Sequence, residues 1–390
     1  MTSSFSPVLQ SRLPQVGTTI FTVMSALATQ HQAVNLGQGF PDFACDPALT
    51  ALVNAAMQAG HNQYPLMAGV PALRDAVSEK LERLYGRHYR AADEITITAG
   101  ATQAIFTALM ALVHPGDEVI VLEPCYDSYL PNIALAGGVV VRVPLTPGTF
   151  RPDFGKIAAA LSAKTRAIII NTPHNPSGTV WSQADMLALE ALLAPTNVIV
   201  ISDEVYEHMV FDGAAHESAS RFGGLAERAI IVSSFGKTYH VTGWKVGFVA
   251  APAALTVEFR KVHQFNVFTV NTPVQHALAA YMAHTDAYAA LPAFYQRKRD
   301  LFRAGMAQTP FKLLPSEGTF FQCADISAVS DRSESDFCQW LTTDIGVTAI
   351  PMSAFYAEGF DQRIIRFCFA KEDSTLEAAL ERLQTRLPRT

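Results

Sequence analysis

The sequence predicts an α/β protein built on a mostly parallel, seven-stranded sheet flanked by helices, with a smaller α+β domain after it. Between about residues 47 and 280, short apolar runs alternate with segments of helical periodicity. Seven such runs occur, mostly separated by helices, as the crossover connections of a parallel sheet require. After about residue 290 this alternation stops, and helices mix with only two strands.

Each element is expected from apolar periodicity and from the turn residues that bound it. A first helix at 20–30 precedes a glycine-rich stretch at 35–42. The seven strands are expected at 95–98, 118–122, 139–143, 167–171, 198–202, 229–233 and 246–250. The helices between and around them are expected at 47–59, 70–85, 103–113, 128–136, 154–161, 183–193 and, interrupted near Pro273, 255–283. The last part should hold helices at 294–308, 335–345 and 374–387 and strands at 319–325 and 363–369.

The length of 390 residues suggests two or three domains. Residues 1–45 are expected to form an N-terminal arm and part of a small domain, residues 46–285 the large domain, and residues 286–390 the small C-terminal domain. Hydrophobic residues make up 49% of the chain and charged residues 16%. This composition supplies a large core and leaves apolar surface for a subunit interface.

Charge and cysteine usage exclude several classes of protein. The net charge is −6 without a block of like charge, so neither nucleic acid nor an anionic membrane is an expected partner. The five cysteines are dispersed, which argues against a disulfide framework or a metal site and fits a reducing compartment. The N-terminus lacks the features of a signal peptide, and no apolar run approaches the ~20 residues that span a bilayer. We therefore expect a cytoplasmic protein.

Lys237 follows the apolar strand expected at 229–233 and lies beside Ser234 and Gly236. An ammonium group at the end of a buried strand is explained if the amine forms a Schiff base with a carbonyl cofactor, pyridoxal phosphate. The alternative is a surface lysine in a loop between strand and helix. Since parallel sheets bind ligands at the carboxyl ends of their strands, the residues at the other strand ends decide between the two.

A phosphate site is expected where the first strand meets a helix. Gly100, Ala101 and Thr102 offer close backbone approach, unpaired N–H groups and a hydroxyl at a helix N-terminus. Ser234 and Lys245 would add a second hydroxyl and a cation. The alternative for the first segment is an ordinary helix N-cap.

Asp203 and Tyr206 follow the strand expected at 198–202. A buried carboxylate needs a partner, and Asp203 would hold the ring nitrogen of the cofactor protonated. Tyr206 and Asn175, the latter in a proline-rich loop, could both reach the phenolate oxygen of the ring. A helix N-cap is the alternative for Asp203, whereas we interpret His174 as structural.

Two further residues complete the expected site. Tyr126 could stack on the ring face or be an ordinary buried aromatic residue. Arg366 stands inside the apolar strand expected at 363–369. Its guanidinium could bind the α-carboxylate of an amino acid through two hydrogen bonds, and the alternative is an arginine at the surface of an edge strand.

In this order along the chain, these motifs resemble those of the class I pyridoxal-phosphate aminotransferases of fold type I, over nearly the whole length. The segments at 35–42 and 63–69 look like the kynurenine aminotransferase/glutamine transaminase K branch. Phe21 and the segments at 233–248 and 262–277 look closest to bacterial methionine aminotransferases. One departure is Tyr126, where relatives often carry Phe.

The resemblance implies that the large domain binds pyridoxal 5′-phosphate and that a homodimer shares its active sites. Tyr64 would reach the phosphate of the partner's cofactor, and Phe268 would also cross over. Gly39 would bind the substrate carboxylate together with Asn175 and Arg366. An uncharged pocket would be lined by Phe21, Phe40, Tyr64 and Phe268. The segment at 265–269 contains no arginine for a second carboxylate, which argues against a dicarboxylate-specific enzyme.

The implied activity is transfer of the amino group of methionine or of aromatic or neutral amino acids to a 2-oxo acid. Lys237, with Asp203 and Tyr206, would carry the catalysis, and Lys237 would move the Cα proton. A cysteine-conjugate β-lyase or kynurenine–oxoglutarate transaminase activity on the same site is the alternative. A non-catalytic regulator that binds the cofactor is a third, but the chain has no spare length for a DNA-binding module.

Overall fold

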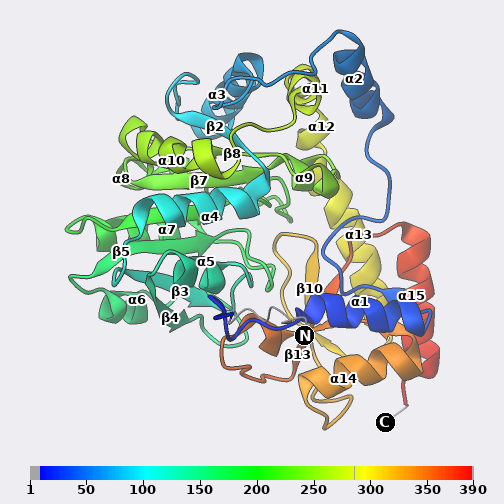
Figure 1. Cartoon of the computed structure of the whole chain (residues 1–390). Helices are drawn as coiled ribbons and strands as arrows, with labels where there is room; N and C mark the ends of the chain where they lie inside the picture. The colour runs from blue at the N-terminus through cyan, green and yellow to red at the C-terminus, as the bar shows by residue number, and fades with distance from the viewer. Residues whose placement is uncertain (1–8, 285, 389–390) are drawn as a thin grey trace, which may run out of the picture.

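Seven strands form one sheet in the order β2-β8-β7-β6-β5-β3-β4 in the computed structural model, which describes residues 9–284 and 286–388 (Figure 1). The strands are β2 Ile95–Thr98, β3 Glu118–Glu123, β4 Val139–Pro144, β5 Thr165–Asn171, β6 Ile199–Asp203, β7 Ala229–Ser234 and β8 Gly247–Ala250. All neighbouring pairs are parallel except those of β8, which is antiparallel to both β7 and β2. This confirms the predicted mostly parallel, seven-stranded sheet.

Both faces of this sheet are buried, because successive side chains of its strands enter different cores. In β3, Val119 and Val121 belong to one apolar cluster, and Ile120 and Leu122 belong to the other. One face is covered by α4 (Gly100–Leu112), α5 (Tyr129–Leu135) and α10 (Ala253–Asn266). The other is covered by helices that include α3 (Pro71–Tyr85) and α7 (Gln183–Leu193). Near-continuous apolar strands are what a sheet covered on both faces requires.

A second sheet, of four strands, lies in the C-terminal part of the chain in the order β12-β13-β10-β9. Its strands are β9 Lys312–Leu313, β10 Phe321–Asp325, β12 Ile350–Pro351 and β13 Ile364–Cys368, and all of its pairs are antiparallel. The helices of this part are α13 Leu291–Met306, α14 Glu334–Trp340 and α15 Asp373–Arg386. Figure 1 shows α1 (Ile20–Gln30) beside them, on the opposite side of the molecule from α2 (Pro47–Gln58).

The N-terminal segment joins the C-terminal part through strand pairing. β1 (Val34–Asn35) pairs in parallel with β11 (Val347–Thr348). The three domain boundaries expected from the sequence stay a prediction, as does the absence of a signal peptide, which concerns the N-terminal residues and so lies mostly outside those described.

Several helices begin or end away from the expected positions. α4 begins at Gly100 rather than at 103, so the predicted phosphate segment forms its first turn. The interruption expected near Pro273 in the stretch at 255–283 is confirmed: α10 ends at Asn266, and α11 (Thr272–Met282) begins with Asn271 as its N-cap and Pro273 in its first turn. The helix expected at 335–345 continues beyond Trp340 as a π-helical turn over Leu341–Ile345. The short strands β1, β9, β11 and β12 have two residues each, too few to show alternation.

The remaining helices are brief or connect these layers. They are α6 Phe154–Ala160, α8 Gly223–Ala226, α9 Phe235–Thr238 and α12 Asp286–Ala289. Across the residues that the structure describes, we find no helix with both the length and the apolar character needed to cross a membrane.

Candidate active site

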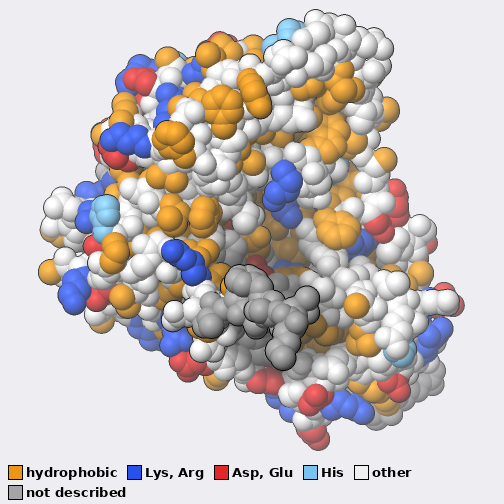
Figure 2. Space-filling view, in the orientation of Figure 1, with side chains coloured by type: hydrophobic (Ala, Val, Ile, Leu, Met, Phe, Trp, Pro, Cys, Tyr) orange, Lys and Arg blue, Asp and Glu red, His pale blue; other side chains and the backbone are white. Residues whose placement is uncertain are grey.

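A cavity of about 300 Å³ opens where the carboxyl ends of the large sheet face the C-terminal part of the chain. Figure 2 shows the molecule hollowed near the middle of this face. The cavity is lined by Phe21, Gln38, Gly39, Gly100, Ala101, Thr102, Ile105, Tyr126, Asp127, Asn171, Asn175, Asp203, Val205, Tyr206, Ser234, Gly236, Lys237, Thr242, Lys245, Val246, Phe321 and Arg366. Most of the site residues predicted from the sequence therefore lie together, as expected if the ligand binds at the carboxyl ends of the parallel strands.

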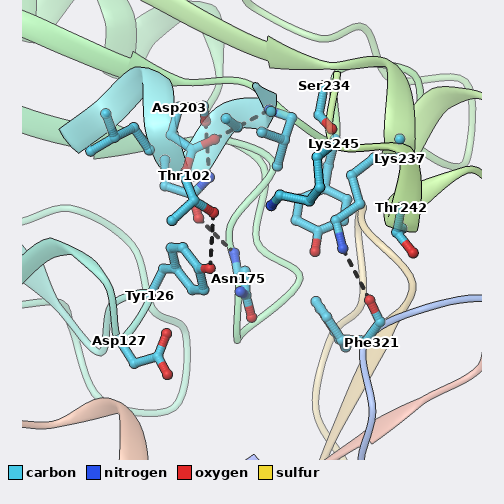
Figure 3. A pocket seen from close by; sticks show the side chains of 18 of the residues that line it. Thr102, Tyr126, Asp127, Asn175, Asp203, Ser234, Lys237, Thr242, Lys245 and Phe321 are labelled. Atoms are coloured by element: carbon cyan, nitrogen blue, oxygen red, sulfur yellow. Dashed lines mark hydrogen bonds between the residues drawn. The ribbon is translucent and has the colours of Figure 1, made fainter. Parts of the chain in front are cut away.

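Lys237 lies in α9, the single helical turn that follows β7. Its ammonium Nζ donates a hydrogen bond to the backbone oxygen of Gly39 at 3.0 Å (Figure 3). The aromatic rings of Tyr206 and Phe320 lie 5.6 and 5.3 Å from Nζ. Burial, together with the positive charges of Arg366 and Lys245, lowers the pKa of Lys237 to about 8. The amine is therefore easier to deprotonate than an ordinary lysine.

Asp203 is buried at the end of β6, with 4% of its surface exposed. It accepts a 2.6 Å hydrogen bond from the hydroxyl of Tyr129 and a 3.3 Å bond from the backbone N–H of Val205. Burial raises the pKa of Asp203 to about 6, which the bond from Tyr129 opposes. None of the ion pairs found among the described residues involves Asp203. A buried carboxylate that has no ion-pair partner suits a cationic N–H group that enters the cavity.

Arg366 lies in β13 between β12 and β10, so it is not on an edge strand, and only 1% of it is exposed. Its Nη1 donates to Oδ1 of Asn175 at 2.7 Å, and its Nη2 donates to the oxygen of Gly37 at 3.1 Å. Its Nε has no partner among the described residues. The guanidinium lies 3.9 Å from the ring centroid of Phe321. A buried guanidinium with an unused donor is prepared for an incoming carboxylate.

Asn175 is held in position by its own loop. Its backbone N–H donates to Oδ1 of Asn171 at 2.8 Å, and Nδ2 of Asn171 donates to the backbone carbonyl oxygen of Asp203 at 2.9 Å. His174 is buried, and its ring nitrogens contact Oγ of Ser177 and the oxygen of Pro124 at 2.6 and 3.0 Å. Burial lowers the pKa of His174 to about 4. These contacts agree with a structural role for His174.

The first turn of α4 faces the cavity without a side-chain cap, because the N-cap residue is Ala99. The hydroxyls of Thr102 and Tyr126 lie 3.3 Å apart. Gly100 has a φ of +79°, and a Cβ at this position would lie 3.4 Å from Nζ of Lys245. An uncapped helix N-terminus beside hydroxyls and a lysine is the donor set that a phosphate group needs.

Three predicted residues do not line the cavity. Tyr64 is 79% exposed and packs edge-to-face on Phe268, with ring centroids 5.1 Å apart. Phe40 is exposed beside a separate groove, where its backbone oxygen accepts a bond from Lys371. The roles expected for Tyr64 and Phe268 across a subunit interface, and for Phe40 in the pocket, stay predictions.

The cavity also contains residues that sequence reasoning missed. Gln38, Asp127, Asn171, Thr242 and Phe321 line it, and Tyr129 does not line it but donates a hydrogen bond to Asp203. In the sequence, Tyr129 looks like an ordinary apolar residue of a helix. Its hydroxyl reaches Asp203 only because α5 packs against the sheet. Asp127 adjoins Tyr126 and could have been found as a carboxylate that follows a strand end.

Replacing Tyr129 by Phe removes the donor to Asp203 and leaves the ring in place. A hydrogen bond to a charged group contributes about 1.5–3 kcal/mol. Because the folded-state pKa of Asp203 is raised to about 6, its carboxylate is charged at pH 8 and largely protonated at pH 5. Loss of the donor raises this pKa further, so we expect Tyr129→Phe to lower the free energy of unfolding more at pH 8 than at pH 5.

Urea unfolding of the cofactor-free protein at both pH values measures this difference. Tyr126→Phe is the matched control, because the partner of its hydroxyl is the neutral Thr102, and its deficit should not depend on pH. Equal deficits for Tyr129→Phe at the two pH values would show that its bond does not act on the charge of Asp203.

The chain matches one known protein family over most of its length. The sequence model of the family described as aminotransferase class I and II matches residues 31–383. Methionine aminotransferase of Escherichia coli (strain K12) is 54% identical over 376 residues, which cover 96% of this chain and 97% of that protein. Kynurenine–oxoglutarate transaminase 3 of Mus musculus is 35% identical, over 95% of this chain and 88% of that protein.

Solved structures agree with the sequence relatives. An Escherichia coli structure, described together with a reactivity that identifies a methionine aminotransferase function, superposes with a TM-score of 0.96 at 54% identity. The match covers 97% of this chain and 100% of that one. The N-succinyldiaminopimelate aminotransferase of Mycobacterium tuberculosis superposes with a TM-score of 0.93 at 42% identity, over 97% and 99% of the two chains.

Proposed function

This chain belongs to the class I and II aminotransferase family, and on that premise we propose that it uses pyridoxal 5′-phosphate to move the amino group of methionine, or of another uncharged or aromatic amino acid, to a 2-oxo acid. It is a transaminase of fold type I. The main support for the proposal is that Lys237, Asp203 and Arg366 all line the same cavity.

The residues present fit the cofactor. Lys237 would carry it covalently through Nζ, and Asp203 would pair with its ring nitrogen. The buried, raised-pKa carboxylate of Asp203 supports this pairing, because it lacks an ion pair within the described chain. The phosphate would be bound by Gly100, Ala101, Thr102, Ser234 and Lys245, the ring face by Tyr126, and the phenolate oxygen by Asn175 and Tyr206. When bound, pyridoxal phosphate withdraws the electrons that remain on a substrate's Cα after its proton leaves.

Arg366 and Lys237 would share the work on the substrate. Arg366 would bind the α-carboxylate through Nε and its terminal nitrogens, with Asn175 and Gly39 beside it, and so fix the Cα–H bond relative to Lys237. The lowered pKa of Lys237, about 8, leaves a useful fraction of neutral amine near pH 7.5. We propose that the substrate's amino group would replace Lys237 on the cofactor, and that the freed amine of Lys237 would then take the Cα proton and pass it on.

The substrate range is proposed from the lining and from the relatives. Phe21 and Phe321 contribute uncharged aromatic surface beside Arg366. The 54% identity to a methionine aminotransferase supports methionine as an amino donor. Kynurenine–oxoglutarate transaminases at 32–35% identity support kynurenine as a second donor. A β-lyase reaction on cysteine conjugates would use the same proton abstraction by Lys237.

We also propose that two copies of the chain form a homodimer in the cytoplasm. Tyr64, Leu66, Phe265 and Phe268 are large hydrophobic residues with 41–91% of their surface exposed, which suits burial against a second copy. The five cysteines are all unpaired, which fits a reducing compartment.

The proposed function is tested with purified, cofactor-loaded protein and methionine, together with one 2-oxo acid at a time. We expect 2-oxo-4-methylthiobutanoate and the matching amino acid in equal amounts by mass spectrometry. Kynurenine in place of methionine tests the second donor. Pyruvate and ammonia released from a cysteine conjugate, without any transamination of methionine or kynurenine, would replace the proposal by the lyase reaction.

A further inference from the structure

Asp127 is an acidic residue of the cavity that the proposed mechanism does not use. It follows Tyr126 in the loop between β3 and α5, and its side chain is only partly exposed. Figure 3 shows its carboxylate beside the ring of Tyr126, directed toward the open space rather than away from it. Within the described residues, no ion pair involves this carboxylate and no other side chain donates a hydrogen bond to it; only the backbone N–H groups of Asp127 and Ser128 act on it.

Asp127 shares the cavity with the residue proposed to bind the substrate carboxylate. Burial raises the pKa of Asp127, whereas the charge of Arg366 and the backbone N–H groups of Asp127 and Ser128 lower it. Arg366 and Asp127 line the same cavity. Arg366 is also the residue proposed to bind the α-carboxylate of the substrate, so Asp127 is close to the space that a bound amino acid would fill.

The charges of the described lining leave no cation for a second substrate carboxylate. Lys245 is proposed to bind the phosphate, Lys237 to carry the cofactor, and Arg366 to bind the α-carboxylate. The other charged lining residues are Asp203 and Asp127, and both are acidic. A second carboxylate would therefore meet a like charge in a partly desolvated space, where repulsion is stronger than in bulk water.

We propose that Asp127 is a specificity-determining residue that disfavours amino acids and 2-oxo acids carrying a second carboxylate relative to uncharged ones. This inference rests on the proposed transaminase function and adds a cause for its preference for uncharged side chains. The negative charge of Asp127 repels the side-chain carboxylate of a substrate such as glutamate, and its isosteric amide, glutamine, escapes that repulsion.

The test compares glutamate with glutamine in the wild type and in Asp127→Asn, which keeps the shape and removes the charge. We expect the ratio of kcat/KM for glutamate to that for glutamine to rise at least about tenfold, or about 1.4 kcal/mol. The ratio for methionine to norleucine, two uncharged donors, should stay unchanged. Asp331→Asn is the control, because Asp331 is fully exposed and outside the cavity, and it should alter neither ratio.

A binding measurement makes the test independent of turnover. Titration calorimetry should show that Asp127→Asn binds glutarate at least about tenfold more tightly than the wild type, with little change for its monoamide. A uniform fall in kcat/KM for all donors, with both ratios constant, would overturn the inference and make Asp127 a support for Tyr126. If the wild type transaminates no amino acid at all, the proposed function fails, whereas constant ratios in an active enzyme contradict the inference alone.

Discussion

Replacing Lys237 by Ala is expected to abolish transamination, with a fall in kcat of at least about 10⁴-fold, the upper range for a positioned proton-transfer group. The physical reason is that no other amine of the described lining is equivalent. Lys245 is exposed and lies beside Gly100 at the proposed phosphate site. Single-turnover kinetics of the cofactor-loaded variant with methionine measure the loss.

The variant should keep its fold, because the amine of Lys237 makes one hydrogen bond, to the oxygen of Gly39. Circular dichroism and the midpoint of thermal unfolding check this point. Lys261→Ala is the control, since Lys261 is exposed and pairs only with the neighbouring Glu258. Transamination retained in Lys237→Ala would refute the assignment of Lys237 as the base.

Replacing Arg366 by Ala is expected to have the second large effect on activity, through the binding of the amino donor. Removing one member of a buried charge pair costs about 3–5 kcal/mol, so kcat/KM should fall about 10²–10³-fold or more. Every amino donor carries the same α-carboxylate, and the loss should therefore be similar for methionine, phenylalanine and kynurenine. It should appear mainly as a higher KM, because the bond to the carboxylate exists before the reaction and throughout it.

Arg366→Lys separates charge from geometry. A lysine keeps the positive charge but cannot make paired, planar bonds to a carboxylate, and it leaves the oxygen of Asn175 without its present donor. Its kcat/KM should lie between those of the wild type and Arg366→Ala. A loss confined to one donor would instead assign Arg366 to the pocket for the side chain.

The site residues that follow strand ends could be identified from the sequence, because the carboxyl ends of parallel strands lie at one edge of a sheet. Lys237, Asp203 and Asn175 were found in this way, and the resemblance to a known family added Gly39 and Phe21. Arg366 was recognised as a charge inside an apolar strand. These signals are local, and each is visible within a few residues.

Contacts between distant elements gave no such local signal. The bond from Tyr129 to Asp203 depends on how α5 packs against the sheet, which periodicity does not specify. The roles expected for Tyr64 and Phe268 concern a second copy of the chain, and the exposure of both residues is the part that a single chain reveals.

We propose that this cavity binds pyridoxal phosphate on Lys237 and that the bound cofactor accepts the amino group of the substrate. The absorbance spectrum of the purified protein, before and after methionine is added without any 2-oxo acid, tests it most directly. We expect a band near the visible edge that methionine converts to the near-ultraviolet band of the aminated cofactor. Absence of any such band, even after incubation with pyridoxal phosphate, would contradict it.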